Sequence, residues 1–209
     1  MKIAILGTGR IGGALARLWQ GHGHEIALVA RNEERAQSLR NDFPRCRVIR
    51  ASACAKAEVV ALCMPWNAAE SALQSVSGLD GKVLIDCTNP LNADASGLIL
   101  DGTASAAEQI QEWAPKAKVV KAFNSLGAAL LGNADFAGVP ADGFYCGDDA
   151  EAKRLVAVLV QDGGLHPVDV GPLKNARCLE PLAMLWIDLA LHQKRGGNFA
   201  FKLISRERG

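Results

Sequence analysis

The chain has 209 residues, a formal net charge of +1, 49% hydrophobic residues and 22% charged residues. This length predicts one large domain, with room for at most a small appendage. The near-neutral charge argues against general attraction to nucleic acid or anionic membranes, and no run approaches the roughly 20 apolar residues of a membrane span.

The chain begins with a predicted strand, a glycine-rich turn and a helix. The apolar run 3–6 stops at a G-x-G-x-x-G pattern whose glycines are Gly7, Gly9 and Gly12. The apolar residues that follow are spaced for one helical face: Ile11, Leu15, Leu18 and Trp19. This order is typical of a dinucleotide-binding unit. It also leaves no room for a signal peptide ahead of the strand.

Each glycine of the turn has a predicted role at a cofactor's phosphates. Gly7 permits the tight turn, Gly9 lets a pyrophosphate approach the backbone, and Gly12 lets the helix pack on the strand. The free N–H groups and the positive dipole end of the helix are expected to face the phosphates. The alternative is a merely structural glycine turn. The predicted phosphate-binding residues are Gly7, Thr8, Gly9, Arg10, Ile11 and Gly12.

The second predicted strand covers residues 25–30, and the residue at its end usually decides which cofactor binds. An NAD enzyme places Asp or Glu there to bond the ribose 2′-hydroxyl. This chain has Ala30-Arg31-Asn32 instead, with Arg35 one helical turn later. A guanidinium bonds a 2′-phosphate with a fork of donors, so these residues predict NADPH. The alternative is that Arg31 is a solvated surface arginine.

A third and a fourth strand are predicted over residues 47–49 and 58–63. The loop 64–67 follows, with Pro65 stiffening the turn, and leads into a helix over residues 68–76. In an open parallel sheet, ligands lie outside the carboxyl ends of the strands, so this loop is expected at the cofactor. Its Trp66 either shields the cofactor or packs against the helix that follows.

The fifth predicted strand, residues 81–87, also ends in a polar loop, Thr88-Asn89-Pro90. A helix over residues 103–113 then leads to a strand over residues 118–124. Three successive strands thus end in the loops Met64-Pro65-Trp66, Thr88-Asn89-Pro90 and Phe123-Asn124-Ser125. Their convergence on one edge of the sheet supports a single site, with the nicotinamide half of the cofactor beside these loops.

Two further strands are predicted over residues 143–147 and 165–170. Between them, residues 148–160 predict an amphipathic helix with Asp148 as its N-cap. The last helix carries more apolar surface than one sheet face readily covers, which predicts a homodimer. The alternative is that this helix buries itself across its own domain. Its apolar residues are Leu179, Leu182, Ala183, Leu185, Trp186, Leu189 and Ala190.

The six cysteines are scattered, without a C-x-x-C pair, and the four histidines form no metal-ligand spacing with them. Cys63 and Cys87 fall in or beside apolar runs, so reduced and packed thiols are expected. These features predict a cytoplasmic protein without a metal.

An ordered set of short motifs resembles one family over nearly the whole chain. The set resembles the coenzyme F420:NADP oxidoreductase family, and it is similar to the cytosolic reductase domain of the Steap ferric reductases. The motifs are Gly7-Thr8-Gly9, Gly23-His24-Glu25, Ala30-Arg31-Asn32, Met64-Pro65-Trp66, Thr88-Asn89-Pro90, Val120-Lys121-Ala122-Phe123-Asn124, Cys146-Gly147-Asp148 and the stretch from Val170 to Arg177.

The resemblance implies roles for individual residues. The glycine loop holds the pyrophosphate, and Arg31 and Arg35 match the 2′-phosphate pocket. Ala30 stands where the family usually has Ser, which is expected to weaken the NADPH preference without reversing it. The cofactor-binding residues beyond the glycine loop are then Arg31, Asn32, Arg35, Met64, Pro65, Trp66, Asn89, Ala122, Phe123 and Asn124.

The expected activity is hydride transfer between NADP(H) and a flavin-type acceptor that is not permanently bound: coenzyme F420, FMN or FAD. Such transfer needs alignment and exclusion of water more than an acid or base, so no catalytic residue is assigned. Lys174 and Arg177 either meet an anionic tail of the acceptor or are solvated charges. The alternatives are an NADPH-dependent dehydrogenase or imine reductase on a small substrate, and a non-catalytic NADPH-binding sensor.

The fold expected is α/β: a Rossmann-type, doubly wound, mostly parallel sheet with a short C-terminal extension ending in a long helix. Residues 1–124 are expected to form the NADP-binding domain. Residues 125–209 are expected to complete the sheet and the acceptor cleft within one compact unit. Steap proteins continue into a haem-bearing membrane domain and this chain does not, which favours a freestanding soluble reductase.

Overall fold

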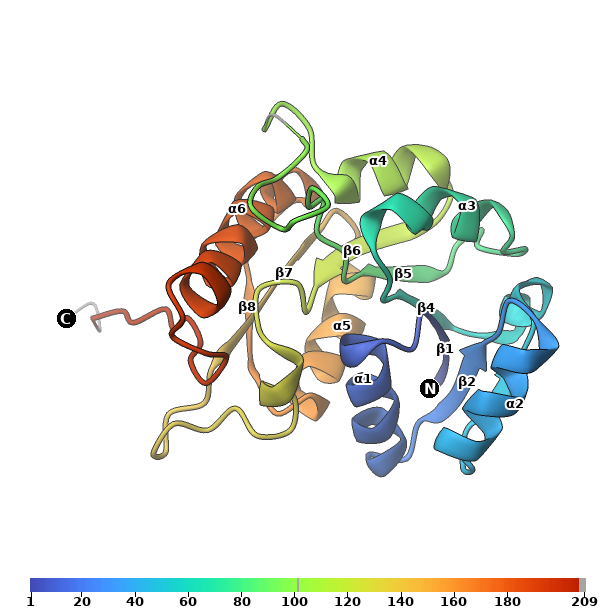
Figure 1. Ribbon diagram of the computed structural model, residues 1–209. Coiled ribbons are helices and arrows are strands. Elements are labelled where there is room, and N and C mark those ends of the chain that lie inside the picture. The colour runs from blue at the N-terminus through green and yellow to red at the C-terminus, as the bar shows by residue number, and fades with distance from the viewer. Residues whose placement is uncertain (101, 207–209) are drawn as a thin grey trace.

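The computed structural model describes residues 1–100 and 102–206, and within them one eight-stranded sheet forms the centre of the molecule (Figure 1). The strands lie in the order β3-β2-β1-β4-β5-β6-β7-β8. Only β6 and β7 pair in antiparallel fashion among these strands. The predicted Rossmann-type, mostly parallel sheet is confirmed. The strands are β1 Lys2–Leu6, β2 Glu25–Val29, β3 Arg47–Ile49, β4 Val59–Leu62, β5 Val83–Asp86, β6 Lys118–Ala122, β7 Asp142–Gly147 and β8 His166–Asp169.

Helices cover both faces of this sheet (Figure 1). One hydrophobic cluster joins the sheet to α1, α2 and α5, and a second joins it to α3, α4 and α6. The doubly wound arrangement follows from this division. The helices are α1 Arg10–Gly21, α2 Glu33–Asp42, α3 Ala69–Gln74, α4 Ala106–Trp113, α5 Ala150–Asp162 and α6 Ala176–Ile187.

The first strand illustrates why the sheet is buried on both faces. Ile3 and Ile5 belong to the cluster under α1 and α5, whereas Ala4 and Leu6 belong to the cluster under α3 and α4. All four side chains are at most 2% exposed. A short apolar run without alternation is typical of such a strand. The carboxyl ends of β1, β4 and β5 consequently lie side by side at one edge of the sheet.

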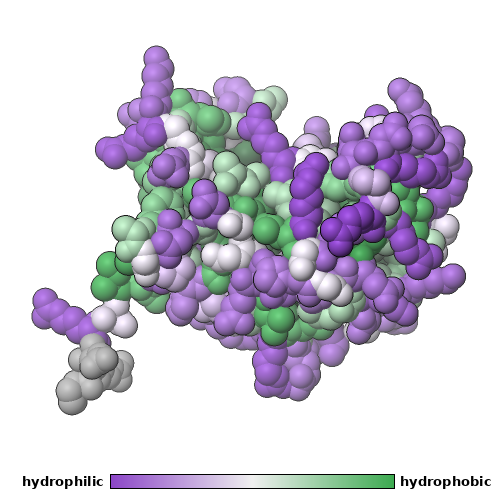
Figure 2. Space-filling model, turned by 90° about the horizontal axis from the view of Figure 1, so that it is seen from below, coloured by the Kyte–Doolittle hydropathy of each residue, from purple (hydrophilic) through white to green (hydrophobic). Residues whose placement is uncertain are grey.

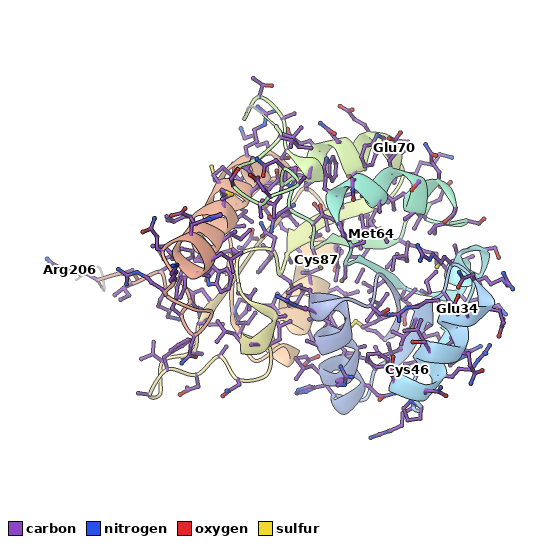
Figure 3. The ribbon with its side chains drawn as sticks, in the orientation of Figure 1. Glu34, Cys46, Met64, Glu70, Cys87 and Arg206 are labelled. Carbon is purple, nitrogen blue, oxygen red and sulfur yellow. The ribbon has the colours of Figure 1, made fainter. Side chains whose placement is uncertain are left out.

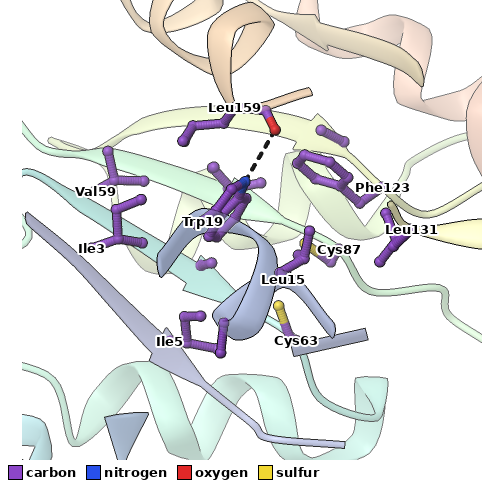
Figure 4. Close-up of a cluster of buried hydrophobic side chains, with 14 of the residues drawn as sticks. Ile3, Ile5, Leu15, Trp19, Val59, Cys63, Cys87, Phe123, Leu131 and Leu159 are labelled. Atoms are coloured by element: carbon purple, nitrogen blue, oxygen red, sulfur yellow. Dashed lines mark hydrogen bonds between the residues drawn. The ribbon is translucent and has the colours of Figure 1, made fainter. Parts of the chain in front are cut away.

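Trp19 locks α1 against the sheet and against α5. Its indole N–H donates to the carbonyl oxygen of Leu159 at 3.0 Å, and its ring meets Phe123 edge-on at 5.7 Å between centroids (Figure 4). Both aromatic side chains are nearly inaccessible to solvent. Because Phe123 directly follows β6, this packing also fixes the start of the loop after that strand.

Two predicted helix starts need correction. The helix predicted from residue 103 begins at Ala106, because Ser105 and Glu108 form a reciprocal capping box. The N-cap of α5 is Asp149, whose side chain accepts from the backbone N–H of Ala152, and not Asp148. Asp148 instead accepts from the backbone N–H of Leu173 at 2.9 Å, so its carboxylate joins two loops.

The predicted C-terminal helix is present as α6, followed by a single wide turn over Asp188–His192. Residues 125–206 continue the sheet begun by the first part of the chain, through β7 and β8. Asp101 and residues 207–209 lie outside the described residues. Among the described helices, none is long and apolar enough to cross a membrane.

Candidate functional site

The glycine-rich segment from the end of β1 into the first turn of α1 contains two glycines at which an added Cβ would clash with backbone atoms. Gly7 has a φ of +90°, and a Cβ there would lie 2.2 Å from the carbonyl oxygen of Cys63. A Cβ at Gly12 would lie 2.0 Å from the carbonyl oxygen of Gly7. At Gly9, by contrast, a Cβ would meet no atom within 4 Å. Gly7 and Gly12 therefore shape the fold, whereas Gly9 leaves its surface open to a ligand.

No side chain of the N-cap or of the first turn compensates the positive end of the α1 helix dipole. Gly9 is the N-cap and supplies no side-chain hydrogen bond, and the first turn holds no acidic residue. Arg10 is exposed and Ile11 is half-buried at this end of the helix. Free backbone N–H groups at a helix N-terminus bind phosphate groups well. This terminus is therefore suited to a pyrophosphate.

A cleft of about 540 Å³ opens beside the glycine turn. Its walls come from that turn, the end of β2, the first turn of α2, and the segment that follows β4. Figure 3 places Met64 near the centre of the molecule and Glu34 on its periphery. A cleft of this size is typical of small-molecule sites. The sequence-predicted residues that line it are Gly7, Thr8, Gly9, Arg31, Arg35 and Met64.

Two arginines make one end of the cleft basic. Arg31 is exposed just after β2, and Arg35 lies in the first turn of α2. Arg35 donates from Nη2 to Thr8 Oγ1 at 2.5 Å and from Nη1 to Ser38 Oγ at 3.1 Å. Asn32 caps α2 by accepting from the backbone N–H of Arg35 at 2.8 Å. The Arg35 guanidinium is thus held against the glycine turn, whereas the side chain of Asn32 caps the N-terminus of α2.

The loop after β4 divides its residues between the cleft and the protein. Met64 lines the cleft, and Pro65 is exposed. Trp66 stacks on Trp113 of α4, with 5.1 Å between ring centroids and 20° between ring planes. Of the two predicted positions for Trp66, the structure shows packing against a helix, although the partner is α4 rather than the helix that directly follows.

The loops after β5 and β6 are joined by an amide pair. Asn89 Nδ2 donates to the carbonyl oxygen of Asn124 at 2.9 Å, and Asn124 Nδ2 donates to Asn89 Oδ1 at 3.0 Å. Phe123 has a φ of +60° and directs its ring into the core, and Ala122 is fully buried. A positive φ at a bulky residue stores strain that the surrounding structure must support.

Three charged side chains that the sequence reasoning missed form a buried cluster beside these loops. Lys121 Nζ lies 2.8 Å from Asp86 Oδ2 and 2.9 Å from Glu180 Oε1, and it donates to the carbonyl oxygen of Thr88 at 2.6 Å. All three charged side chains are at most 3% exposed. The available signal was a lysine and an aspartate inside apolar strand runs, because such residues are almost never buried unpaired.

Charge compensation governs the protonation of this cluster. Burial by itself would lower the pKa of Lys121, but the carboxylates of Asp86 and Glu180 raise the pKa above its ordinary value. Burial raises the pKa of Glu180, against the influence of Lys121. Glu180 also accepts from the N-terminal amides of α4 at Ala106, 3.1 Å away. Lys121 is consequently a charged, fully engaged donor.

Two buried polar atoms at this edge of the sheet have no hydrogen-bond partner among the described residues. They are Thr88 Oγ1, after β5, and Asn124 Oδ1, after β6. Buried polar groups are normally paired, so unpaired ones require an explanation such as a ligand. One of these atoms belongs to a hydroxyl that can donate, and the other is an acceptor.

The two cations considered for an acceptor's tail differ in their surroundings. Arg177 forms a two-pronged pair with Glu108, with N–O distances of 2.7 and 2.8 Å. This pairing lowers the pKa of Glu108 and raises that of Arg177. Lys174 is exposed on the turn before α6. Arg177 is therefore already engaged within the protein.

The thiols near the cleft are unsuited to nucleophilic chemistry. Cys63 and Cys87 follow the neighbouring strands β4 and β5 and lie in the core (Figure 4). A hydrogen bond with Cys63, together with burial, raises the pKa of Cys87 well above its ordinary value. All six cysteines are free. Within the described residues, no group of three or more His, Cys, Asp or Glu side chains is arranged to hold a metal ion.

Comparison with known proteins places these features in context. Residues 2–90 match the family model described as NADP oxidoreductase, coenzyme F420-dependent. The F420-dependent NADP reductase of Methanothermobacter marburgensis is 32% identical over 215 residues, which cover 93% of this chain and 94% of that protein. A solved structure from Arthrobacter sp. FB24, assigned as an F420-dependent NADP reductase, is 32% identical with a TM-score of 0.89 and covers 98% of this chain and 100% of that one.

A second kind of relative is much longer than this chain. Metalloreductase STEAP3 of Rattus norvegicus is 32% identical over 192 residues. The match covers 88% of this chain but 37% of that protein. The likeness to STEAP3 thus concerns one part of a larger molecule, whereas the likeness to the reductases extends over nearly their whole length.

Proposed function

Because the chain belongs to the family of coenzyme F420-dependent NADP oxidoreductases, we propose that it transfers a hydride between NADP(H) and the deazaflavin coenzyme F420. The observation that carries the proposal is the likeness to F420-dependent NADP reductases over nearly the full length of both proteins. FMN and FAD are the other acceptors of the same chemical class.

The cleft supports binding of NADP(H). Gly9 leaves the N-terminus of α1 open to the pyrophosphate, and Arg31 and Arg35 offer donors to the 2′-phosphate. Outside the lining of this cleft, after β5 and β6, Thr88 Oγ1 and Asn124 Oδ1 are a buried donor and a buried acceptor without partners, which matches the carbonyl and NH₂ groups of the nicotinamide carboxamide. When bound, the reduced cofactor supplies the hydride from C4 of its nicotinamide.

The protein's contribution to the transfer is alignment rather than proton chemistry. Cys87 is held as a neutral thiol, and Lys121 is engaged by three oxygen atoms. Hydride transfer between two rings requires a near-attack geometry and a site that excludes water. We therefore assign no proton donor, and we propose that the acceptor is a planar, dissociable ring that stacks on the nicotinamide.

Isotope transfer tests the reaction directly. NADPH deuterated at the transferred C4 position is expected to pass its label to F420, because the hydride moves between carbons without exchanging with water. Mass spectrometry of reduced F420 measures the label, with unlabelled NADPH as the control. Reduction of a small carbonyl or imine, without reduction of any flavin or deazaflavin, would contradict this proposal and favour the alternative hypothesis of a dehydrogenase or imine reductase. Binding without turnover of any acceptor would favour an NADPH sensor.

We also propose that the molecule is a homodimer formed partly by α6. Leu179 and Ala183 of this helix are buried in their own domain, but Leu185 is 49% exposed. Leu191, after the helix, is 61% exposed, and Figure 2 shows hydrophobic surface beside the C-terminal segment. Light scattering at micromolar concentration is expected to give twice the mass of one chain. Leu185→Glu should lower the measured mass toward that of one chain. A single-chain mass for the unmodified protein would contradict the proposal.

The remaining assignments complete the proposed function. Residues 1–124 form the NADP-binding part, and residues 125–209 complete the acceptor cleft. The partners are small-molecule substrates and a second copy of the chain, without nucleic acid or membrane. We propose a cytoplasmic location, since the proposed substrates, NADP(H) and coenzyme F420, are diffusible small molecules.

A further inference from the structure

A closed ring of polar contacts joins β5, β6 and α6 at the edge of the sheet where the nicotinamide is proposed to lie. Lys121 donates to the carbonyl oxygen of Thr88 at 2.6 Å. Asp86 Oδ1 accepts from the backbone N–H of the same threonine at 2.8 Å. Both backbone polar groups of Thr88 are therefore held by one buried ion pair, which fixes the position of its backbone.

The ring closes through Asn124. Its Nδ2 donates to the carbonyl oxygen of Leu179 at 3.0 Å as well as to Asn89. Leu179 precedes Glu180, which contacts Lys121 at 2.9 Å. Since a carbonyl oxygen only accepts, the atom of Asn124 beside Leu179 must be nitrogen, and this fixes Oδ1 as the unpartnered atom.

Stability alone does not explain a buried cluster of this kind. Replacing a buried ion pair or triad by neutral residues of similar volume is often neutral or stabilising. In this chain the cluster contacts the backbone of Thr88, one of the two residues with an unpaired polar atom. Its position favours a role in holding that atom in place.

We infer that Lys121 is a positioning residue, which holds Thr88 and, through Glu180 and α6, Asn124 in the geometry that recognises the nicotinamide carboxamide. The inference rests on the proposed binding of NADP(H) and extends it to residues that do not touch the cofactor. Lys121 is fully buried and contacts the backbone of Thr88 and the side chain of Glu180, so it acts through Thr88 and α6.

The decisive variant removes the whole cluster's charge at nearly constant volume: Lys121→Met with Asp86→Asn and Glu180→Gln. It avoids the unpaired buried carboxylates that Lys121→Met alone would leave. Lys118→Met, on the same strand but partly exposed and paired with Asp149, is the matched control. Circular dichroism and thermal unfolding verify that each variant is folded.

Three ligands separate positioning from a general loss of structure. The first is NADP⁺, the second is its 3-acetylpyridine analogue, which lacks the carboxamide NH₂, and the third is adenosine 2′,5′-bisphosphate, which lacks the nicotinamide. The unmodified protein is expected to prefer NADP⁺ to the analogue by about tenfold, because Asn124 Oδ1 loses its donor. The triple variant should lose this preference, while its affinity for the bisphosphate stays within about twofold.

The rate of hydride transfer is a second measurement that tests the inference. The single-turnover rate of hydride transfer should fall about a hundredfold in the triple variant, because a displacement of about 1 Å at the reacting atoms has that effect. A triple variant that keeps both the analogue preference and the rate would overturn the inference. Parallel losses of affinity for all three ligands would also overturn it, since they indicate general damage. If the unmodified protein discriminates the carboxamide but reduces no acceptor, the proposed reaction fails and the positioning role stands.

Discussion

Arg31→Glu is expected to narrow or reverse the preference of this protein for NADPH over NADH. The unmodified chain should bind NADPH about 10- to 150-fold more tightly, because a charge-assisted hydrogen bond to the 2′-phosphate contributes about 1.5–3 kcal/mol. The glutamate would repel the 2′-phosphate and accept from the 2′-hydroxyl of NADH instead. Titration calorimetry with both cofactors measures the two affinities.

A matched control separates the local contact from the change in net charge. Arg45→Glu makes the same charge change at an exposed arginine that does not line the cleft. We expect this control to leave the ratio of the two affinities unchanged. Equal affinities for NADPH and NADH in the unmodified protein would sink the assignment of Arg31 and Arg35 to a 2′-phosphate pocket.

Gly12→Ala is expected to lower the free energy of unfolding by about 3 kcal/mol, the upper part of the range for overpacked sites. The added methyl group would lie 2.0 Å from the carbonyl oxygen of Gly7, and backbone cannot move aside as a flexible side chain does. Urea-induced unfolding measures the change. Loss of cofactor binding should accompany it, because α1 must move away from β1.

Gly9→Ala is the companion variant, and it is expected to weaken cofactor binding while leaving stability nearly unchanged. The Cβ at this position meets no protein atom within 4 Å, so stability should change by less than about 1 kcal/mol. NADP(H) affinity should fall, because the methyl group lies where the pyrophosphate is proposed to approach. If Gly12→Ala proves as stable as Gly9→Ala, the close helix–strand packing described above is wrong.

Local patterns were sufficient to predict most of the fold. The run 3–6, the glycine turn and the 3.6-residue spacing of apolar residues up to Trp19 predict β1 and α1 correctly. The mostly parallel pairing follows from the alternation of strands and helices, whereas the strand order is known from the structure. These signals work because backbone permissiveness and hydrophobic periodicity act within a few residues of one another.

Local patterns were ambiguous where several residues compete for the same role. Asp148 and Asp149 are adjacent and chemically equal, and only the contact between Asp148 and Leu173 decides which of them caps α5. Trp66 had two possible neighbours, and its partner Trp113 lies on another helix.

The amino-acid sequence by itself determined the individual strands, the glycine turn and the basic residues at the end of β2, because each of these depends on neighbours along the chain. Only the tertiary structure showed that Lys121 is fully buried between Asp86 and Glu180, which lie 35 and 59 residues away in the sequence. It also showed that Phe123 turns into the core, while Thr88 and Asn124 keep unpaired polar atoms. Burial and pairing of a charge are decided by residues from other strands and helices, and no local pattern carries that information.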